Sequence, residues 1–111
     1  MNNETGSKMP GVTHLQFAVL EALGTATKRG KDLRKSLNEF GIKKSGPGFY
    51  QMMARMEEAG FVQGWYDQKI VEGQIIKERH YRITGKGINA FNRTTEFYQN
   101  TRAGMLLPAL A

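Results

Sequence analysis

The sequence predicts a mostly helical α+β fold, in which three helices precede a β-hairpin and a last helix. Three observations lead to this fold class. Apolar side chains repeat at helical spacing in four separate stretches. Between residues 61 and 83 the pattern changes to alternation and is rich in residues that favour strands. Capping residues and glycines stand where these stretches begin or end. For 111 residues a single domain is the default expectation.

The first predicted helix covers residues 14–23, with Thr13 as its N-cap and Gly24 at its end. The preceding residues, 1–12, are polar and glycine-containing, and we expect a flexible N-terminal segment there. Apolar side chains surround most of the helix, and such a helix is buried on more than one side. In a chain this small, the second side is expected to face a partner subunit.

A second helix is predicted over residues 31–40, after a short stretch that has room for one brief strand. Its inner face carries Leu33, Leu37 and Phe40. The region from residue 28 to residue 44 has seven basic and two acidic side chains, so it supplies five of the chain's six net positive charges. A charge run is often only a solvated face. Its position directly before the next helix favours contact with phosphate groups. The basic residues are Lys28, Arg29, Lys31, Arg34, Lys35, Lys43 and Lys44.

The third helix is predicted between Gly46 and Gly60, with the sequence GPGFYQMMARMEEAG. Pro47 suits the first helical position. Gly60 followed by Phe61 fits a left-handed C-cap, with Phe61 folding back towards Met56. One stripe should face the core and consists of Phe49, Met52, Met53 and Met56. The opposite face carries Tyr50, Gln51, Ala54, Arg55 and Glu58.

The N-terminal part of that opposite face has few long side chains, and Gly48 precedes it. A helix of this kind can approach another surface closely, and the positive end of its dipole favours phosphate. The alternative is an ordinary amphipathic helix whose outer face is only solvated.

A β-hairpin is predicted from strands over residues 61–68 and 75–83, joined by a turn at residues 71–74. The end of the second strand near Tyr81 should enter the core. An isolated hairpin is marginally stable, so its base must pack on the helices. Its basic residues could contact a nucleic-acid backbone, or the hairpin could merely close the core. They are Lys69, Lys77, Arg79 and Arg82.

Thr84 should cap a last helix over residues 85–102. Its apolar stripe is too long for a three-helix core to cover fully. The stripe consists of Ile88, Phe91, Thr95 and Tyr98, with Phe97 as a second apolar point. Residues 103–111 are strongly apolar for a free tail and should pack on this subunit or its partner.

The predicted order of elements over residues 13–84 is that of a winged helix-turn-helix domain, whose third helix enters a DNA groove and whose hairpin is the wing. Three segments resemble the PadR-like family of bacterial transcriptional regulators: LQFAVLEALG, SGPGFYQMMARMEEAGFV and RHYRITGKG. The resemblance covers about Leu15 to Tyr98. The chain departs from the family's pattern at Gly48, where threonine is typical, at Gln51, where proline is common, and at His80, where tyrosine is common.

The resemblance implies a short, single-domain regulator that represses transcription as a homodimer on an inverted repeat in double-stranded DNA. It also implies that the helix over residues 85–102 is a C-terminal dimerisation helix. It also implies a small aromatic or amphipathic effector that releases the DNA. Gln51 can read adenine, Arg55 can read guanine, and Tyr50 can contact phosphate. The full set of predicted DNA-binding residues is Gly48, Tyr50, Gln51, Arg55, Lys28, Arg29, Lys31, Lys43, Lys44, Lys77 and Arg79. The predicted dimer contacts are Phe17, Leu20, Phe91 and Tyr98, and the predicted effector-site residues are Trp65 and Phe97.

Other classes of function are less well supported by the sequence. A pI near 9.8 suits a polyanionic partner. Without cysteine there is neither a disulfide nor thiolate chemistry. His14 and His80 lie on different predicted elements, and no nucleophile–base spacing stands out, so we expect no enzyme, metal site or cofactor. No apolar run is long enough to cross a bilayer, and we expect a cytoplasmic protein with no membrane partner. The alternatives are a winged helix that binds proteins and a MarR-like regulator.

Overall fold

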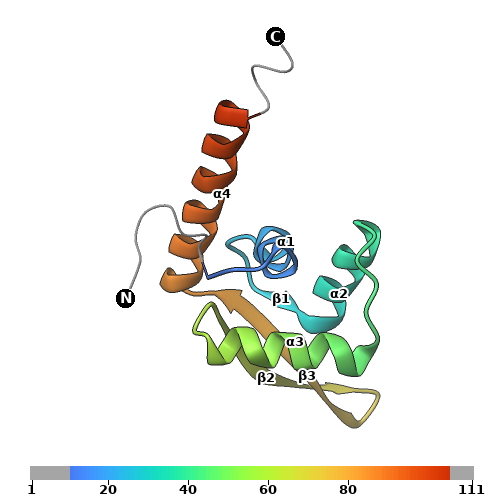
Figure 1. The fold of residues 1–111 in the computed structure, drawn as a ribbon. Coiled ribbons are helices and arrows are strands. Elements are labelled where there is room, and N and C mark those ends of the chain that lie inside the picture. The colour runs from blue at the N-terminus through green and yellow to red at the C-terminus, as the bar shows by residue number, and fades with distance from the viewer. Residues whose placement is uncertain (1–10, 106–111) are drawn as a thin grey trace.

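The computed structural model describes residues 11–105, and within this range the chain forms four helices and a three-stranded antiparallel sheet. Figure 1 shows α1, α2, α3 and the sheet gathered into one body, from which α4 extends. The predicted fold class is therefore confirmed. The elements are α1 (His14–Leu23), β1 (Lys28–Arg29), α2 (Gly30–Glu39), α3 (Gly46–Glu58), β2 (Val62–Val71), β3 (Gln74–Ile83) and α4 (Gly85–Met105).

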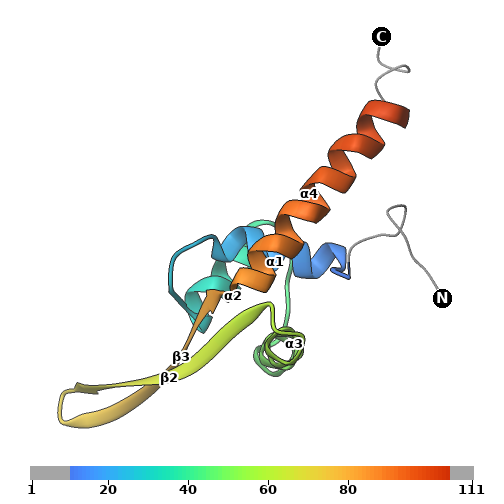
Figure 2. The ribbon, with the colours of Figure 1, turned by 90° about the vertical axis from the view of Figure 1, so that its left-hand side faces the viewer.

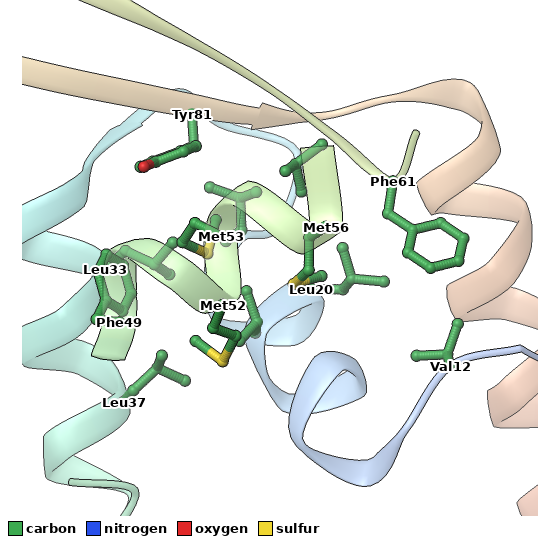
Figure 3. Close-up of a cluster of buried hydrophobic side chains, with 13 residues drawn as sticks. Val12, Leu20, Leu33, Leu37, Phe49, Met52, Met53, Met56, Phe61 and Tyr81 are labelled. Atoms are coloured by element: carbon green, nitrogen blue, oxygen red, sulfur yellow. The ribbon is translucent and has the colours of Figure 1, made fainter. Parts of the chain in front are cut away.

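Two ends of the chain differ from the predicted boundaries. Val12, which the sequence placed at the end of the flexible N-terminal segment, is buried in the core. Its side chain lies beside α1, where it shields apolar surface of that helix from water (Figure 3). At the other end α4 continues to Met105, three residues beyond the predicted end. Most of the N-terminal segment (1–10) and of the apolar tail (106–111) lies outside the described residues.

Side-chain caps fix where the helices begin. The Thr13 hydroxyl accepts from the Gln16 N–H, and the Gln16 side chain accepts from the Thr13 N–H, which makes a capping box for α1. Ser45 caps α3 by accepting from the Gly48 N–H at 3.1 Å. Because Ser45 is the cap, Pro47 is the second helical residue instead of the first. The C-cap prediction is confirmed: Gly60 has φ 85°, and the Phe61 N–H donates to the Met56 carbonyl at 3.0 Å.

The core is built mainly on the inner face of α3. The four predicted side chains, Phe49, Met52, Met53 and Met56, are all buried. Figure 3 shows them between side chains of α1, α2 and β3. These partners are Leu20, Leu23, Leu33, Leu37 and Tyr81. Since the body uses one face of α3 in this way, the other face is left to solvent.

Two predicted positions of apolar side chains are wrong. Phe40 is 71% exposed because α2 ends at Glu39, and the chain turns away through Gly41 at φ 87°. Ile42 takes its place, and its N–H donates to the Leu37 carbonyl at 2.9 Å. Leu20, predicted at a subunit interface, is 1% exposed in this subunit's own core and has no surface to offer a partner.

The hairpin of β2 and β3, which we call the wing, is longer than predicted. Its strands pair from Val62 opposite Ile83 to Val71 opposite Gln74, and β1 pairs with the other edge of β3. The strands join through Glu72 and Gly73, both with positive φ, as a two-residue hairpin turn requires. Figure 2 shows the tip of the wing projecting well beyond the helices, while α4 leaves the body in another direction.

The helices described in residues 11–105 include none that is long and apolar enough to cross a membrane.

Candidate nucleic-acid interface

The outer face of α3 carries the polar side chains predicted to read DNA bases. Gln51 and Arg55 are exposed, together with Ala54 and Glu58. They stand one turn apart on the same side of the helix, opposite the buried methionines. This arrangement leaves both side chains free to reach a ligand that lies against α3.

Tyr50 has a packing role beside any role in binding. It is 41% exposed, and the edge of its ring meets Phe49 at 4.9 Å between centroids. A Cβ added at Gly30 would lie 2.9 Å from the Tyr50 hydroxyl, so the start of α2 rests against this ring. Gly48 also serves the local structure, because a Cβ there would lie 3.0 Å from the capping hydroxyl of Ser45.

A cleft of about 300 Å³ between α2 and the start of α3 is lined largely by basic side chains. We call it the basic cleft. Arg34 holds the connecting loop in place, since its Nε donates to the Lys44 carbonyl at 2.9 Å. Three lining residues, Arg34, Lys35 and Asn38, were not among the predicted site residues, although helical spacing places them opposite Leu33 and Leu37. The complete lining is Lys31, Arg34, Lys35, Asn38, Lys44 and Tyr50.

Three basic residues predicted to contact DNA are instead engaged within the subunit. The Lys28 ammonium donates to the Ala22 carbonyl at 2.6 Å. Arg29 pairs with Asp32 at 2.7 Å and with Glu78 at 3.2 Å, which ties α2 to the wing. Arg79 pairs with a glutamate of α3, as described below. Of the remaining predicted lysines, Lys31, Lys43 and Lys77 are exposed, and Lys44 is half-buried.

Arg79 fixes the wing to α3. Its guanidinium pairs with Glu57 at 2.6 Å and lies over the Tyr66 ring, 4.8 Å from the centroid. Burial is the largest single influence and opposes the charge, but the interactions with Glu57 and Tyr81 together outweigh it and raise the pKa of Arg79. A Cβ at Gly64 would lie 2.9 Å from both partners, so glycine there makes room for the pair. We call Glu57, Tyr66 and Arg79 the clamp.

The ion pair of Arg29 and Asp32 should make stability depend on pH. The hydrogen bond from Arg29 lowers the pKa of Asp32 below its ordinary value. The folded state therefore binds fewer protons than the unfolded chain, so this stabilisation is present above the ordinary carboxylate pKa and is lost as pH falls through the lowered value. An Arg29→Gln variant should unfold at a slightly lower temperature than the wild type at neutral pH, and the difference should vanish in strong acid. Circular dichroism melts across this range measure it.

Arg34→Gln is the matched control for that prediction, because Arg34 bonds a backbone carbonyl and no carboxylate. The difference in unfolding temperature between Arg34→Gln and the wild type should stay constant from neutral pH to strong acid. A constant difference for Arg29→Gln would contradict the pairing with Asp32.

Aromatic side chains connect α1 with α4. Phe17 stacks on Phe91 at 4.7 Å and meets the Tyr98 ring edge-on at 5.9 Å. The Tyr98 hydroxyl also lies 2.7 Å from His14 Nδ1. All of these are partly exposed on the described residues of the two helices, and Phe97 joins them through Tyr98. Figure 2 shows α4 extending away from the tip of the wing.

The two residues predicted for an effector site do not come together. Trp65 stacks on His80 within the wing at 6.0 Å, whereas Phe97 belongs to the cluster on α4. Among the described contacts, none joins the two side chains. Within one subunit the wing and α4 leave the body in different directions (Figure 2), and a site that uses both residues stays a prediction for a dimer.

The pair α2–α3, with a long hairpin beside it and β1 at the hairpin's edge, defines a winged helix-turn-helix domain followed by a long helix. Three solved structures share this fold. A PadR family transcriptional regulator from Eggerthella lenta DSM 2243 is 24% identical, with a TM-score of 0.63 over 79% of this chain and 74% of that one.

A PadR-like transcription factor from Bacteroides fragilis is 14% identical, with a TM-score of 0.67 over 87% of this chain and 89% of that one. A PadR family transcription regulator from Clostridium difficile R20291 is 15% identical, with a TM-score of 0.67 over 85% of this chain and 99% of that one. No protein-family model and no curated protein matches the sequence. The resemblance indicated by the sequence motifs is thus confirmed for the fold.

Proposed function

We propose that this chain is a DNA-binding transcriptional regulator of the PadR type, which binds an inverted repeat as a homodimer and represses transcription. The single observation that carries the proposal is the exposed face of α3, where Gln51 and Arg55 stand free beside the basic cleft. The likeness of the fold to three regulators of this family supports it.

In the proposed complex, α3 of each subunit lies in the major groove. Arg55 donates to guanine and Gln51 bonds adenine, which are the side-chain pairings that base edges favour. The phosphates on either side are neutralised by the basic cleft and by Lys43. The two copies of α3 contact half-sites about 34 Å apart, one turn of the duplex.

The proposed dimer forms through α4. This helix has 21 residues, a length of about 31 Å at a rise of 1.5 Å per residue. Figure 1 shows much of it beyond the body. Its half-buried aromatic side chains, with those of α1, offer apolar surface that a second copy would cover. The residues proposed at this contact are Phe17, Phe91 and Tyr98.

The aromatic or amphipathic effector implied by the family resemblance stays part of the proposal. The cluster on α1 and α4 offers rings for stacking at the proposed dimer contact, and Phe97 lies at its edge. Trp65 lies on the wing, so its fluorescence would report such a compound only through a movement of the wing.

The alternative is a winged helix that binds a protein partner and not DNA. The two functions differ in their response to salt, because each phosphate contact releases counterions. As a test, the affinity for random-sequence duplex DNA should fall steeply as salt rises. A Lys31→Gln/Lys35→Gln variant removes four lysines from the dimer, so the slope of log affinity against log salt should decrease by about 3.6. Fluorescence anisotropy on a labelled duplex measures both.

The matched control is Lys86→Gln/Arg93→Gln, which removes the same charge from exposed positions on α4. It should leave the slope nearly unchanged. Absence of duplex binding at low salt, or an equal effect of both double variants, would contradict the proposed interface and favour the protein-binding alternative.

A further inference from the structure

The tip of the wing is apolar and exposed, and the proposed function gives it no role. Ile70 and Ile75 are 73% and 68% exposed, and they pair directly across the two strands. Exposed isoleucines on a soluble hairpin cost free energy of hydration, so a covered position in some complex is the natural expectation. The pair of adjacent isoleucines makes the tip a candidate contact surface.

The two isoleucines point to the same side of the wing as the clamp. Side chains alternate between the faces of a strand, so Tyr66, Gln68 and Ile70 share one face of β2. Their cross-strand partners on β3 are Arg79, Lys77 and Ile75. The base of this face packs on α3 through Glu57. The isoleucines thus extend the face that looks towards the proposed DNA.

A cleft of about 400 Å³ connects this face to the basic surface of α2. Its lining includes Lys31 and Tyr50 from the helices and Tyr66 and Lys77 from the wing. The surface is therefore continuous from α2 across α3's first turn to the wing. A polyanion seated on α2 and α3 would run along the wing towards its tip.

Two of the four basic side chains of the wing form ion pairs within the subunit. Lys69 pairs with Glu78 at 3.3 Å, and Arg79 pairs with Glu57. Of the described basic side chains on this face, Lys77 is the one outside these ion pairs. A wing of this composition offers carbon at its tip and little free positive charge.

The length of the wing suits the spacing of the grooves. From the clamp at Tyr66 to Ile70 the strand advances about 14 Å at a rise of roughly 3.4 Å per residue. The major and minor grooves of a duplex alternate at about half a helical turn, roughly 17 Å. The two lengths are comparable, so with α3 in a major groove a wing of this reach would bring the isoleucines close to the neighbouring minor groove.

We propose that Ile70 and Ile75 form an apolar wedge that enters the minor groove beside each half-site and bends the duplex there. The inference rests on the proposed function. The occupant is the sugar walls and base steps of the minor groove, against which isoleucine is a known type of wedge. The clamp sets the angle at which the wedge arrives, and the base steps at that position contribute sequence preference through their deformability.

The test uses a duplex that the full-length wild-type protein selects from a random pool, and an Ile70→Ser/Ile75→Ser variant. The variant should bind this duplex roughly tenfold more weakly, because apolar contact is lost. Its slope of log affinity against log salt should stay at the wild-type value, because no phosphate contact is removed. Hydroxyl-radical protection of the flanking minor groove and the bend seen in circular-permutation electrophoresis should both disappear.

Two control variants are needed. One distinguishes the two faces of the wing, and the other distinguishes apolar contact from contact with phosphate. Val71 lies at the same tip, 39% exposed, and pairs with Gln74 on the opposite face, so Val71→Ser should leave affinity and bend unchanged. Lys77→Gln should reduce the slope by about 1.8 for a dimer and retain the bend. Circular dichroism of all variants confirms folding, which exposed substitutions should not disturb.

The outcomes are distinguishable. If the wild type selects a duplex and the isoleucine variant binds and bends it equally well, the wedge is wrong and the proposed function stands. A changed salt slope in the isoleucine variant would also overturn the wedge. If the wild type selects no duplex, both proposals fail.

Discussion

A Gln51→Ala/Arg55→Ala variant is expected to lose the preference for the duplex that the wild type selects, by about 100-fold or more. Each bidentate contact to a base edge contributes roughly 1–3 kcal/mol of discrimination, and the variant removes both from each subunit. Binding to random duplexes should weaken much less, because the basic cleft remains. Competition between the selected and a scrambled duplex, measured at one salt concentration, gives the ratio directly.

The variant should fold as the wild type does, since both side chains are exposed on α3 and the core face is untouched. Arg93→Ala is the control for charge: it removes the same group from an exposed position on α4 and should retain the preference. Tyr50→Phe is the control for packing, because it keeps the ring against Gly30 and removes only the hydroxyl. A double variant that still discriminates would place base recognition on some element other than α3.

The core face of α3 could be predicted from the sequence because four apolar side chains at helical spacing leave one face for the body. The same reasoning failed at Phe40. Helical spacing assumes that the helix continues, and α2 ends one residue earlier. In the loop that follows α2, Ile42 packs against the core instead, and its N–H donates to the Leu37 carbonyl. Helical periodicity predicts which side chains share a face within a helix, but it does not predict the position of a side chain beyond the end of the helix.

On α1 the sequence could not separate the subunit's own core from a partner surface. Leu20 and Phe17 both lie on a helix that is apolar nearly all round, and both were expected at the dimer contact. The structure buries Leu20 under α3 and leaves Phe17 partly exposed against α4. The distinction depends on where α3 and α4 approach α1, and that is a property of the tertiary fold.

The ion pairs of the candidate site were beyond sequence reasoning for a related reason. Arg29 meets Glu78 across 49 residues, and Arg79 meets Glu57 across 22. A basic residue near a predicted interface reads as a phosphate contact until its acidic partner is known. The exposed position of Lys31 was easier to predict, because a lysine on the polar side of a helix needs no partner in the subunit.

The junction between the wing and α4 gives the second large prediction, at Gly87. A Cβ added there would lie 2.1 Å from the Phe61 carbonyl oxygen and 2.7 Å from Ile83. The carbonyl cannot easily retreat, because it accepts the Thr84 N–H at 3.1 Å. Gly87→Ala should therefore lower the free energy of unfolding by roughly 3 kcal/mol, the upper range for overpacking, and the melting temperature by about 15 °C.

Gly85→Ala is the matched control, since a Cβ at Gly85 would meet nothing within 4 Å. In the same helix and with the same chemical change, it should leave stability unchanged or raise it slightly, because alanine is the better helix former. The sequence Thr84-Gly85-Lys86-Gly87 then has a physical meaning: Thr84 caps α4, while Gly87 lets α4 meet the chain at Phe61. If Gly87→Ala melts with the wild type, the approach of α4 to Phe61 is looser than described.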